Sequence, residues 1–314
     1  MSKITIIGAG SVGATIANDA VIMGIASEVV LIDVKKDKAY GEALDIYQGT
    51  RYCSPAIVRS GDYADAEGSD IVVITSGIAR KPGQSRLDLI QTNAGIIKDI
   101  TKQIVAHAPD AIFIIVSNPV DVLTYIFHRA SGIPENRIIG TGTSLDTARL
   151  QTELARYFHI TPRNVHAHVY GEHGDSSFVP WSLARIGNNR IEDLKRMGSK
   201  GVPTDWDYNY EAMENFVHNS GAEVIRTKGA TFYAIAISVC NICKCILTGI
   251  GTALTVSTMM HGEYGIDDVC LSTLTVVDRK GVCYKVPNEL TEEELRKLRN
   301  SADRLKEVIA QVNL

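Results

Sequence analysis

The sequence predicts an α/β protein in which a doubly wound parallel sheet is followed by a second, mixed α/β domain. In the first half of the chain, short continuous apolar runs alternate with longer helical patterns, as is typical of strands covered on both faces. After Gly142 the pattern changes, and helical stretches flank short strands. We therefore expect two closely packed domains, at residues 1–141 and 142–314, with a site in the cleft between them.

The strands expected in the first domain are short apolar runs rich in β-branched residues. They cover residues 4–7, 28–32, 71–74, 111–116 and 137–139. In the second domain the patterns predict two helices, one short strand and an antiparallel hairpin. The helices cover residues 146–158 and 291–309, and the strand covers residues 165–170. The hairpin pairs residues 267–278 with residues 282–285.

One apolar stretch, residues 231–256, is long enough to suggest a membrane span. Asn241 and Lys244 lie near its middle, and a lysine at the centre of a bilayer costs ~3 kcal/mol. We therefore expect a packed core helix here. Its part near residues 231–248 is expected to pack back on the first domain.

Composition and charge exclude several classes of protein. The 314 residues are 45% hydrophobic, which is enough for a sizeable core, and the net charge is −4 with acidic and basic residues interspersed. Since no basic face is present, nucleic acid is not an expected partner. The apolar run that follows Met1 is too short for a signal peptide, so we expect a cytoplasmic protein that binds no membrane.

The six cysteines form no evident disulfide framework. Cys240, Cys243 and Cys245 resemble half a metal site, but no second pair of Cys or His lies at ligand spacing. We expect buried core cysteines and no metal.

A glycine-rich turn follows the first expected strand and opens the helical pattern at residues 14–23. The first glycine permits a tight turn, the second lets the backbone approach a pyrophosphate, and the third lets the helix pack on the strand. Asp33 ends the second strand, 20 residues after the last glycine, where its carboxylate accepts hydrogen bonds from ribose hydroxyls and repels a 2′-phosphate. The pattern predicts a Rossmann domain that binds NAD through Gly8, Gly10, Ser11, Val12, Gly13 and Asp33.

His173 stands in a context that a satisfied core histidine rarely needs. His173 lies among glycines at the end of an apolar strand, in the segment 169–176 (VYGEHGDS). Segments 117–121 (SNPVD) and 145–149 (LDTAR) accompany it. Together these motifs closely resemble the L-lactate and L-malate dehydrogenase family, and the resemblance covers essentially the whole chain.

The resemblance implies reversible hydride transfer between NADH and a small 2-keto acid. It assigns His173 as the general acid and base, and Asp146 as the carboxylate that orients the ring. Arg149, one helical turn from Asp146, would bind the substrate carboxylate through a two-bond fork. Arg86 matches the arginine that a closing loop brings over the carbonyl.

The resemblance also implies a wider set of contacts. Asn118 would hold the substrate oxygen and contact the cofactor, and the family carries a cis peptide bond after it. Thr231 and Ile235 match residues that line the substrate pocket and the nicotinamide face, although plain helix packing explains both equally well. Thr75 and Gly77, which follow the strand at 71–74, are further candidates for cofactor contact.

Two signals conflict over the substrate. Segments 171–176 and 86–89, with Thr231, resemble lactate dehydrogenase. Arg80, however, lies where the family senses the far end of the substrate, with glutamine typical for pyruvate and arginine for oxaloacetate. A buried charge left unpaired costs ~3 to 5 kcal/mol, so Arg80 favours oxaloacetate unless its side chain points to solvent. Arg80 thus favours malate, whereas the whole-chain resemblance favours L-lactate dehydrogenase.

The alternative function is a non-catalytic NAD-binding module, but such a module would not need all the expected catalytic residues. The family implies a homotetramer built from dimers, or a homodimer.

Relatives activated by fructose 1,6-bisphosphate carry an arginine and a histidine where this chain has Gln151 and His166. A neutral amide does not replace a guanidinium, so we expect little or no such activation.

Overall fold

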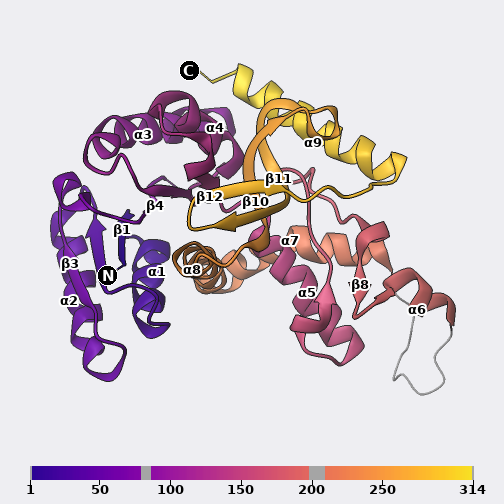
Figure 1. Ribbon diagram of the computed structural model, residues 1–314, viewed down its shortest axis with the longest axis horizontal. Coiled ribbons are helices and arrows are strands. Elements are labelled where there is room, and N and C mark those ends of the chain that lie inside the picture. The colour runs from indigo at the N-terminus through magenta and orange to yellow at the C-terminus, as the bar shows by residue number, and fades with distance from the viewer. Residues whose placement is uncertain (1, 79–85, 198–208, 313–314) are drawn as a thin grey trace.

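The computed structural model describes residues 2–78, 86–197 and 209–312 (Figure 1). Within them, nine strands form one sheet in the order β12-β11-β10-β6-β5-β4-β1-β2-β3. The six strands of the first domain pair in parallel, in the order 3-2-1-4-5-6 of a doubly wound Rossmann sheet. They are β1 (Lys3–Ile7), β2 (Glu28–Ile32), β3 (Ile57–Ser60), β4 (Ile71–Ile74), β5 (Ile112–Ile115) and β6 (Ile138–Gly140).

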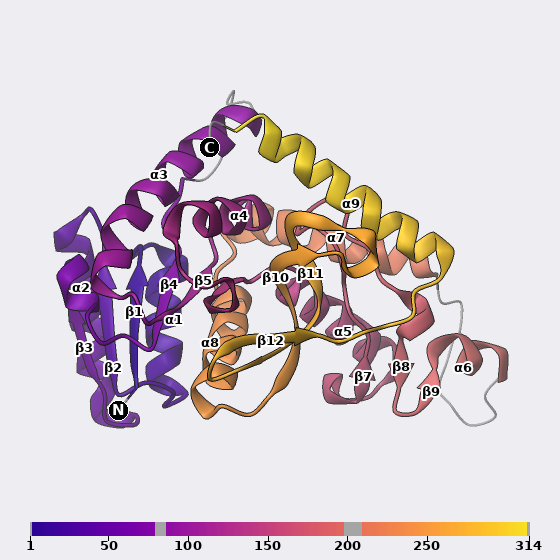
Figure 2. The same ribbon diagram turned by 45° about the horizontal axis from the view of Figure 1, so that its top comes forward.

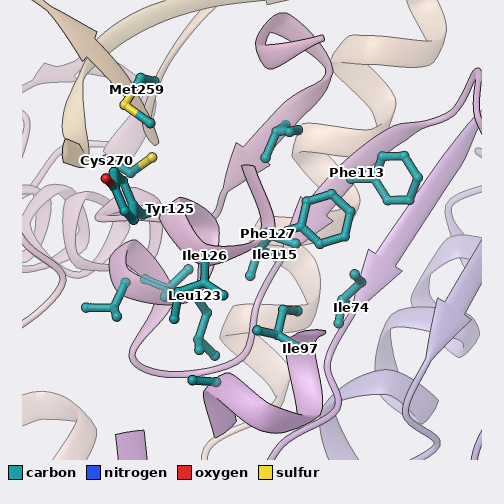
Figure 3. Close-up of a cluster of buried hydrophobic side chains, with 14 of the residues drawn as sticks. Ile74, Ile97, Phe113, Ile115, Leu123, Tyr125, Ile126, Phe127, Met259 and Cys270 are labelled. Atoms are coloured by element: carbon teal, nitrogen blue, oxygen red, sulfur yellow. The ribbon is translucent and has the colours of Figure 1, made fainter. Parts of the chain in front are cut away.

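Helices cover both faces of this parallel sheet, which is why its strands are continuously apolar. Successive residues of a strand point to opposite faces, so Ile6 packs in one buried cluster and Ile7 in the other. The cluster on the α3 and α4 side includes Phe113 and Phe127, whose ring centroids lie 4.9 Å apart (Figure 3). The helices of this domain are α1 (Ser11–Ile22), α2 (Lys36–Gly49), α3 (Arg86–His107) and α4 (Val120–Ser131).

The second half of the chain extends the same sheet. β10 (Thr252–His261) joins β6 in antiparallel pairing, and β11 (Asp267–Asp278) and β12 (Gly281–Lys285) follow as the expected hairpin. A smaller sheet contains β7 (Val165–His166), β8 (Arg185–Ile186) and β9 (Asn189–Arg190). The helices here are α5 (Ser144–Phe158), α6 (Ile191–Met197), α7 (Tyr210–Lys228), α8 (Tyr233–Thr248) and α9 (Glu292–Ala310).

Two expected elements differ from the structure. The helix expected at residues 231–256 ends with α8 at Thr248, because Gly249 adopts a left-handed conformation with φ 69° and the chain then enters β10. The strand expected at 165–170 is only two residues long, since the chain beyond His166 leaves the small sheet. Sequence reasoning also missed β3.

Helix α8 packs against α1, across one face of the parallel sheet (Figure 2). Cys240, Cys243 and Cys245 are buried in this contact, as the sequence predicts for core cysteines. Among the described residues, no helix combines the length and the apolar character needed to cross a membrane.

The turn at Gly281 connects the hairpin of the second half to the first domain. Gly281 has φ +92°, and a Cβ there would lie 1.9 Å from the carbonyl oxygen of Asn136. The Asn136 amide also donates to the carbonyl oxygen of Lys280 at 2.7 Å. The backbones therefore meet too closely for any side chain at this position.

We predict that Gly281→Ala lowers the free energy of unfolding by ~1 to 2 kcal/mol for the left-handed backbone and by ~1 to 3 kcal/mol more for the steric overlap. Gly68→Ala is the matched control, because Gly68 has φ +73° but a Cβ added there would meet no atom within 4 Å. Chemical denaturation of both variants measures the difference. Equal losses in the two variants would contradict the close contact at Asn136.

Candidate active site

A cavity of ≈ 380 Å³ lies between the two halves of the chain, and it gathers most of the predicted catalytic and substrate-binding residues. Asn118 reaches it from the end of β5, while Asp146 and Arg149 reach it from α5. His173 lies on the loop after β7. Val12, Thr231 and Ile235 also line this cavity.

The centre of the site is a hydrogen-bonded trio. The Nδ1 atom of His173 lies 2.6 Å from Oδ2 of Asp146, and the other carboxylate oxygen of Asp146 accepts from Nη1 of Arg149 at 2.9 Å. Asp146 and Arg149 are three residues apart on α5, so they lie on the same face of the helix. The side chain of Asp146 is 7% exposed, whereas that of His173 is 27% exposed and borders the cavity.

This arrangement shifts the pKa of both partners. Burial alone would lower the pKa of His173, but the charge and hydrogen bond of Asp146 outweigh it and raise the pKa to about 9. Burial alone would raise the pKa of Asp146, but the charges and hydrogen bonds of His173 and Arg149 hold it below its usual value. At neutral pH the carboxylate is therefore ionised and the imidazole holds a proton.

Asn118 lies in the tight turn between β5 and α4. Its peptide bond to Pro119 is cis, as the family resemblance implies. The side-chain oxygen of Asn118 accepts from the backbone N–H of Val120 at 3.3 Å. The main-chain carbonyl oxygen of Asn118 accepts from the side-chain amide of Asn93 at 2.8 Å. The side-chain oxygen of Asn93 also accepts from the backbone N–H of Ile78. One buried amide on α3 therefore links the segment that follows β4 to the segment that follows β5.

The glycine turn fits a dinucleotide pyrophosphate. Gly8 has φ +107°, and a Cβ on Gly13 would lie 1.9 Å from the carbonyl oxygen of Gly8. A Cβ on Gly10 would meet no atom within 4 Å, so the backbone there is open to a ligand. Among the described residues, no side chain caps the start of α1 at Ser11, which leaves its N–H groups to an anion.

Asp33 follows β2 and faces this turn. Its Oδ2 accepts from the backbone N–H of Ala9 at 2.7 Å, and its Oδ1 accepts from that of Lys35 at 2.9 Å. Thr75 closes the other side of the turn, since its hydroxyl donates to the carbonyl oxygen of Gly8 at 2.9 Å. Gly77 follows, and a Cβ there would approach the Asn93 amide at 3.4 Å. This geometry fits the adenosine ribose and pyrophosphate of a dinucleotide, and the contacts of these residues with NAD stay predictions.

The side chains of two predicted arginines lie outside what the structure describes. Arg80 lies outside the described residues, together with the rest of segment 79–85. Arg86 is the first residue of α3, and its side chain also lies outside what is described. Their expected contacts with the substrate stay predictions.

Sequence reasoning missed one wall of the cavity. His218, Gly221, Ala222 and Ile225 line it from α7. A Cβ on Gly221 would lie 3.4 Å from the guanidinium of Arg149, so this helix passes close to the trio. The other three lining residues lie three, four and seven positions after His218, so all four share one face of the helix. Nothing in the sequence indicates that this face borders the site.

Comparison with known proteins agrees with this architecture. The family model of the lactate/malate dehydrogenase NAD binding domain matches residues 2–140, and that of the lactate/malate dehydrogenase alpha/beta C-terminal domain matches residues 143–313.

Curated relatives match over the full length. The chain is 46% identical to an L-lactate dehydrogenase of Clostridium botulinum, over 98% of this chain and 96% of the relative. It is 42% identical to one of Thermoanaerobacter pseudethanolicus, over 100% of both. Among solved structures, a minor L-lactate dehydrogenase from Enterococcus mundtii superposes with a TM-score of 0.94 at 38% identity, covering 100% of this chain and 99% of that one.

These matches define an NAD-dependent oxidoreductase that acts on a CH–OH group. The chain belongs to the lactate/malate dehydrogenase family. It is thus an NAD-dependent 2-hydroxy-acid dehydrogenase with the predicted α/β fold, and its substrates are a 2-keto acid and the corresponding 2-hydroxy acid.

We predict that the enzyme prefers NADH to NADPH by about tenfold or more in kcat/KM, because the Asp33 carboxylate repels a 2′-phosphate. Asp33→Ser should narrow this preference. Asp37→Ser removes an exposed carboxylate in the first turn of α2 and should leave the preference intact. Equal kcat/KM values of wild type with NADH and NADPH would contradict the role of Asp33 in selecting the cofactor.

We predict that His173→Asn lowers kcat by about 10²- to 10⁴-fold, the contribution of a positioned general acid and base, while the Kd for NADH changes little. Steady-state rates and the fluorescence of bound NADH measure the two quantities. His107→Asn, at the exposed end of α3, serves as the control. Substantial turnover by His173→Asn would show that His173 is not the general acid and base.

Proposed function

We propose that the chain is an L-lactate dehydrogenase, which interconverts pyruvate and L-lactate. The observation that carries the chemistry is the trio of His173, Asp146 and Arg149 at a cavity that also reaches the glycine turn through Val12. The substrate choice is supported by the whole-length likeness to relatives named L-lactate dehydrogenase, at 42–46% identity.

The proposed proton transfer uses the raised pKa of His173. In pyruvate reduction its protonated Nε2 donates to the carbonyl oxygen, and in lactate oxidation the neutral ring accepts the hydroxyl proton. Asp146 holds Nδ1, which aims Nε2 at the cavity and stabilises the imidazolium. NAD, when bound, supplies or accepts the hydride.

The substrate carboxylate is proposed to bind Arg149. Its guanidinium is already held by Asp146 through Nη1, so the remaining N–H groups of the fork are positioned before substrate arrives. Asn118 is proposed to hold the substrate oxygen through its amide N–H groups, since its oxygen already accepts from Val120. Thr231 borders the same cavity. Arg86 is proposed to approach the carbonyl when the preceding segment closes.

Malate dehydrogenase is the second candidate, and Arg80 is the specific observation that favours it. A guanidinium over the far end of the substrate would pair with the second carboxylate of oxaloacetate. Glu172 supports the lactate assignment instead, because the sequence GEHGDS is typical of lactate enzymes. The structure buries this glutamate, and its carboxylate accepts from the hydroxyl of Ser176.

We further propose the NAD-binding domain at residues 1–141, the catalytic domain at 142–314, and a homotetramer or homodimer. Exposed apolar side chains support self-association. Tyr40, Leu44 and Tyr47 are 60%, 40% and 50% exposed along one face of α2, and Tyr233 on α8 is 65% exposed.

We predict that wild type reduces pyruvate at least about tenfold more efficiently than oxaloacetate, and that Arg80→Gln changes this ratio by less than about threefold. Lys81→Gln, which removes a neighbouring cation, is the matched control. Paired kcat/KM values with the two keto acids measure the effect. If wild type instead prefers oxaloacetate and Arg80→Gln reverses the order by about 10²- to 10³-fold, the malate candidate is correct.

A further inference from the structure

We propose that Asp121 is a positioning residue, a second carboxylate that fixes the backbone of His173 and favours the protonated form of its ring. The inference rests on the catalytic role proposed for His173. Asp121 is not among the residues that line the cavity, so we assign it no contact with substrate and no part in proton transfer.

The contact between Asp121 and His173 is direct and buried. Oδ2 of Asp121 accepts from the backbone N–H of His173 at 2.7 Å, and Asp121 is 2% exposed. A charge-assisted bond of this kind is stronger than one between neutral groups. The carboxylate therefore sets the position of the residue whose ring must reach the substrate.

Two neighbouring N–H groups of the same loop are also held by other elements. The N–H of Gly171 donates to the carbonyl oxygen of Ser272 on β11 at 2.9 Å. The N–H of Glu172 donates to the hydroxyl of Ser301 on α9 at 2.7 Å. Of the three consecutive contacts, the one at His173 is made by a charged group.

The location of Asp121 couples two parts of the site. It lies in the first turn of α4, where the helix dipole favours a negative charge. Asn118, three residues earlier, borders the cavity. A single short segment thus carries both the amide proposed to hold the substrate oxygen and the carboxylate that holds the catalytic loop.

Several charged or titratable groups surround this pair. Asp146 and Arg149 face His173 from α5, Glu172 lies next to it on the loop, and Cys270 on β11 is near Asp121. Burial raises the pKa of Asp121 to about 6, opposed by the hydrogen bond from the N–H of His173 and by the charge of its ring. The group is therefore ionised at neutral pH, and its charge acts with that of Asp146 to raise the pKa of His173.

The test is the pH dependence of turnover by Asp121→Asn, which keeps the size of the side chain and an oxygen acceptor but removes the charge. Loss of a negative charge destabilises the imidazolium. The alkaline fall of pyruvate reduction and the rise of lactate oxidation should both move to lower pH, by about half to one unit. The Kd for NADH should stay within about threefold of wild type.

Ser301→Ala is the matched control, because it removes a neighbouring hold on the same loop without changing any charge. It should lower kcat without moving the pH profile. An unshifted profile in Asp121→Asn, or an equal shift in Ser301→Ala, would overturn the proposal.

Asp121→Ser is the second neutral variant and should show the same downward shift. Failure of both neutral variants to fold would mean that the carboxylate serves folding alone, and it would also overturn the proposal. Inactivity of wild type with both pyruvate and oxaloacetate would instead refute the proposed function. The two failures are thus distinguishable.

Discussion

The buried carboxylate of Asp146 is the interaction on which the rest of the site depends. One oxygen binds the His173 ring and the other binds the Arg149 guanidinium, and the side chain is only 7% exposed. A buried ion is tolerated only when its partners are in place, and removal of one partner costs ~3 to 5 kcal/mol. The group proposed to move the proton and the group proposed to bind the carboxylate are therefore positioned together, because they share one anion.

The sheet explains how these groups reach one cavity. The glycine turn follows β1, Asp33 follows β2, Thr75 follows β4 and Asn118 follows β5, so the first domain presents its contacts at the carboxyl ends of parallel strands. Antiparallel pairing of β10 with β6 then continues the sheet, and β11 holds the loop of His173 through the backbone of Gly171. The second half of the chain is thereby fixed relative to the first without a linker.

Much of the fold and of the site could be predicted from the sequence, for identifiable reasons. Strands buried on both faces leave unambiguous apolar runs, and the glycine turn must use glycine because a Cβ on Gly13 would overlap the backbone. The motifs around Asp146 and His173 named both residues, although only the folded chain brings them within 2.6 Å. The strand β10 was mistaken for a continuation of the helix because a buried strand and a buried helix are both simply apolar. Asp121 lies within the segment 117–121 that carries the family resemblance, but the sequence indicated no role for it, since an acidic residue in the first turn of a helix is ordinary.

The shared carboxylate keeps the imidazole of His173 protonated at neutral pH before substrate binds. The pH titration of the His173 ring in the free enzyme, followed by NMR after specific labelling of histidine, tests it most directly, with His173→Asn used to assign the resonance. We expect a pKa of about 9, well above the ordinary value for histidine. A midpoint at or below about 6.5, the unperturbed value, would show instead that burial outweighs the pairing with Asp146.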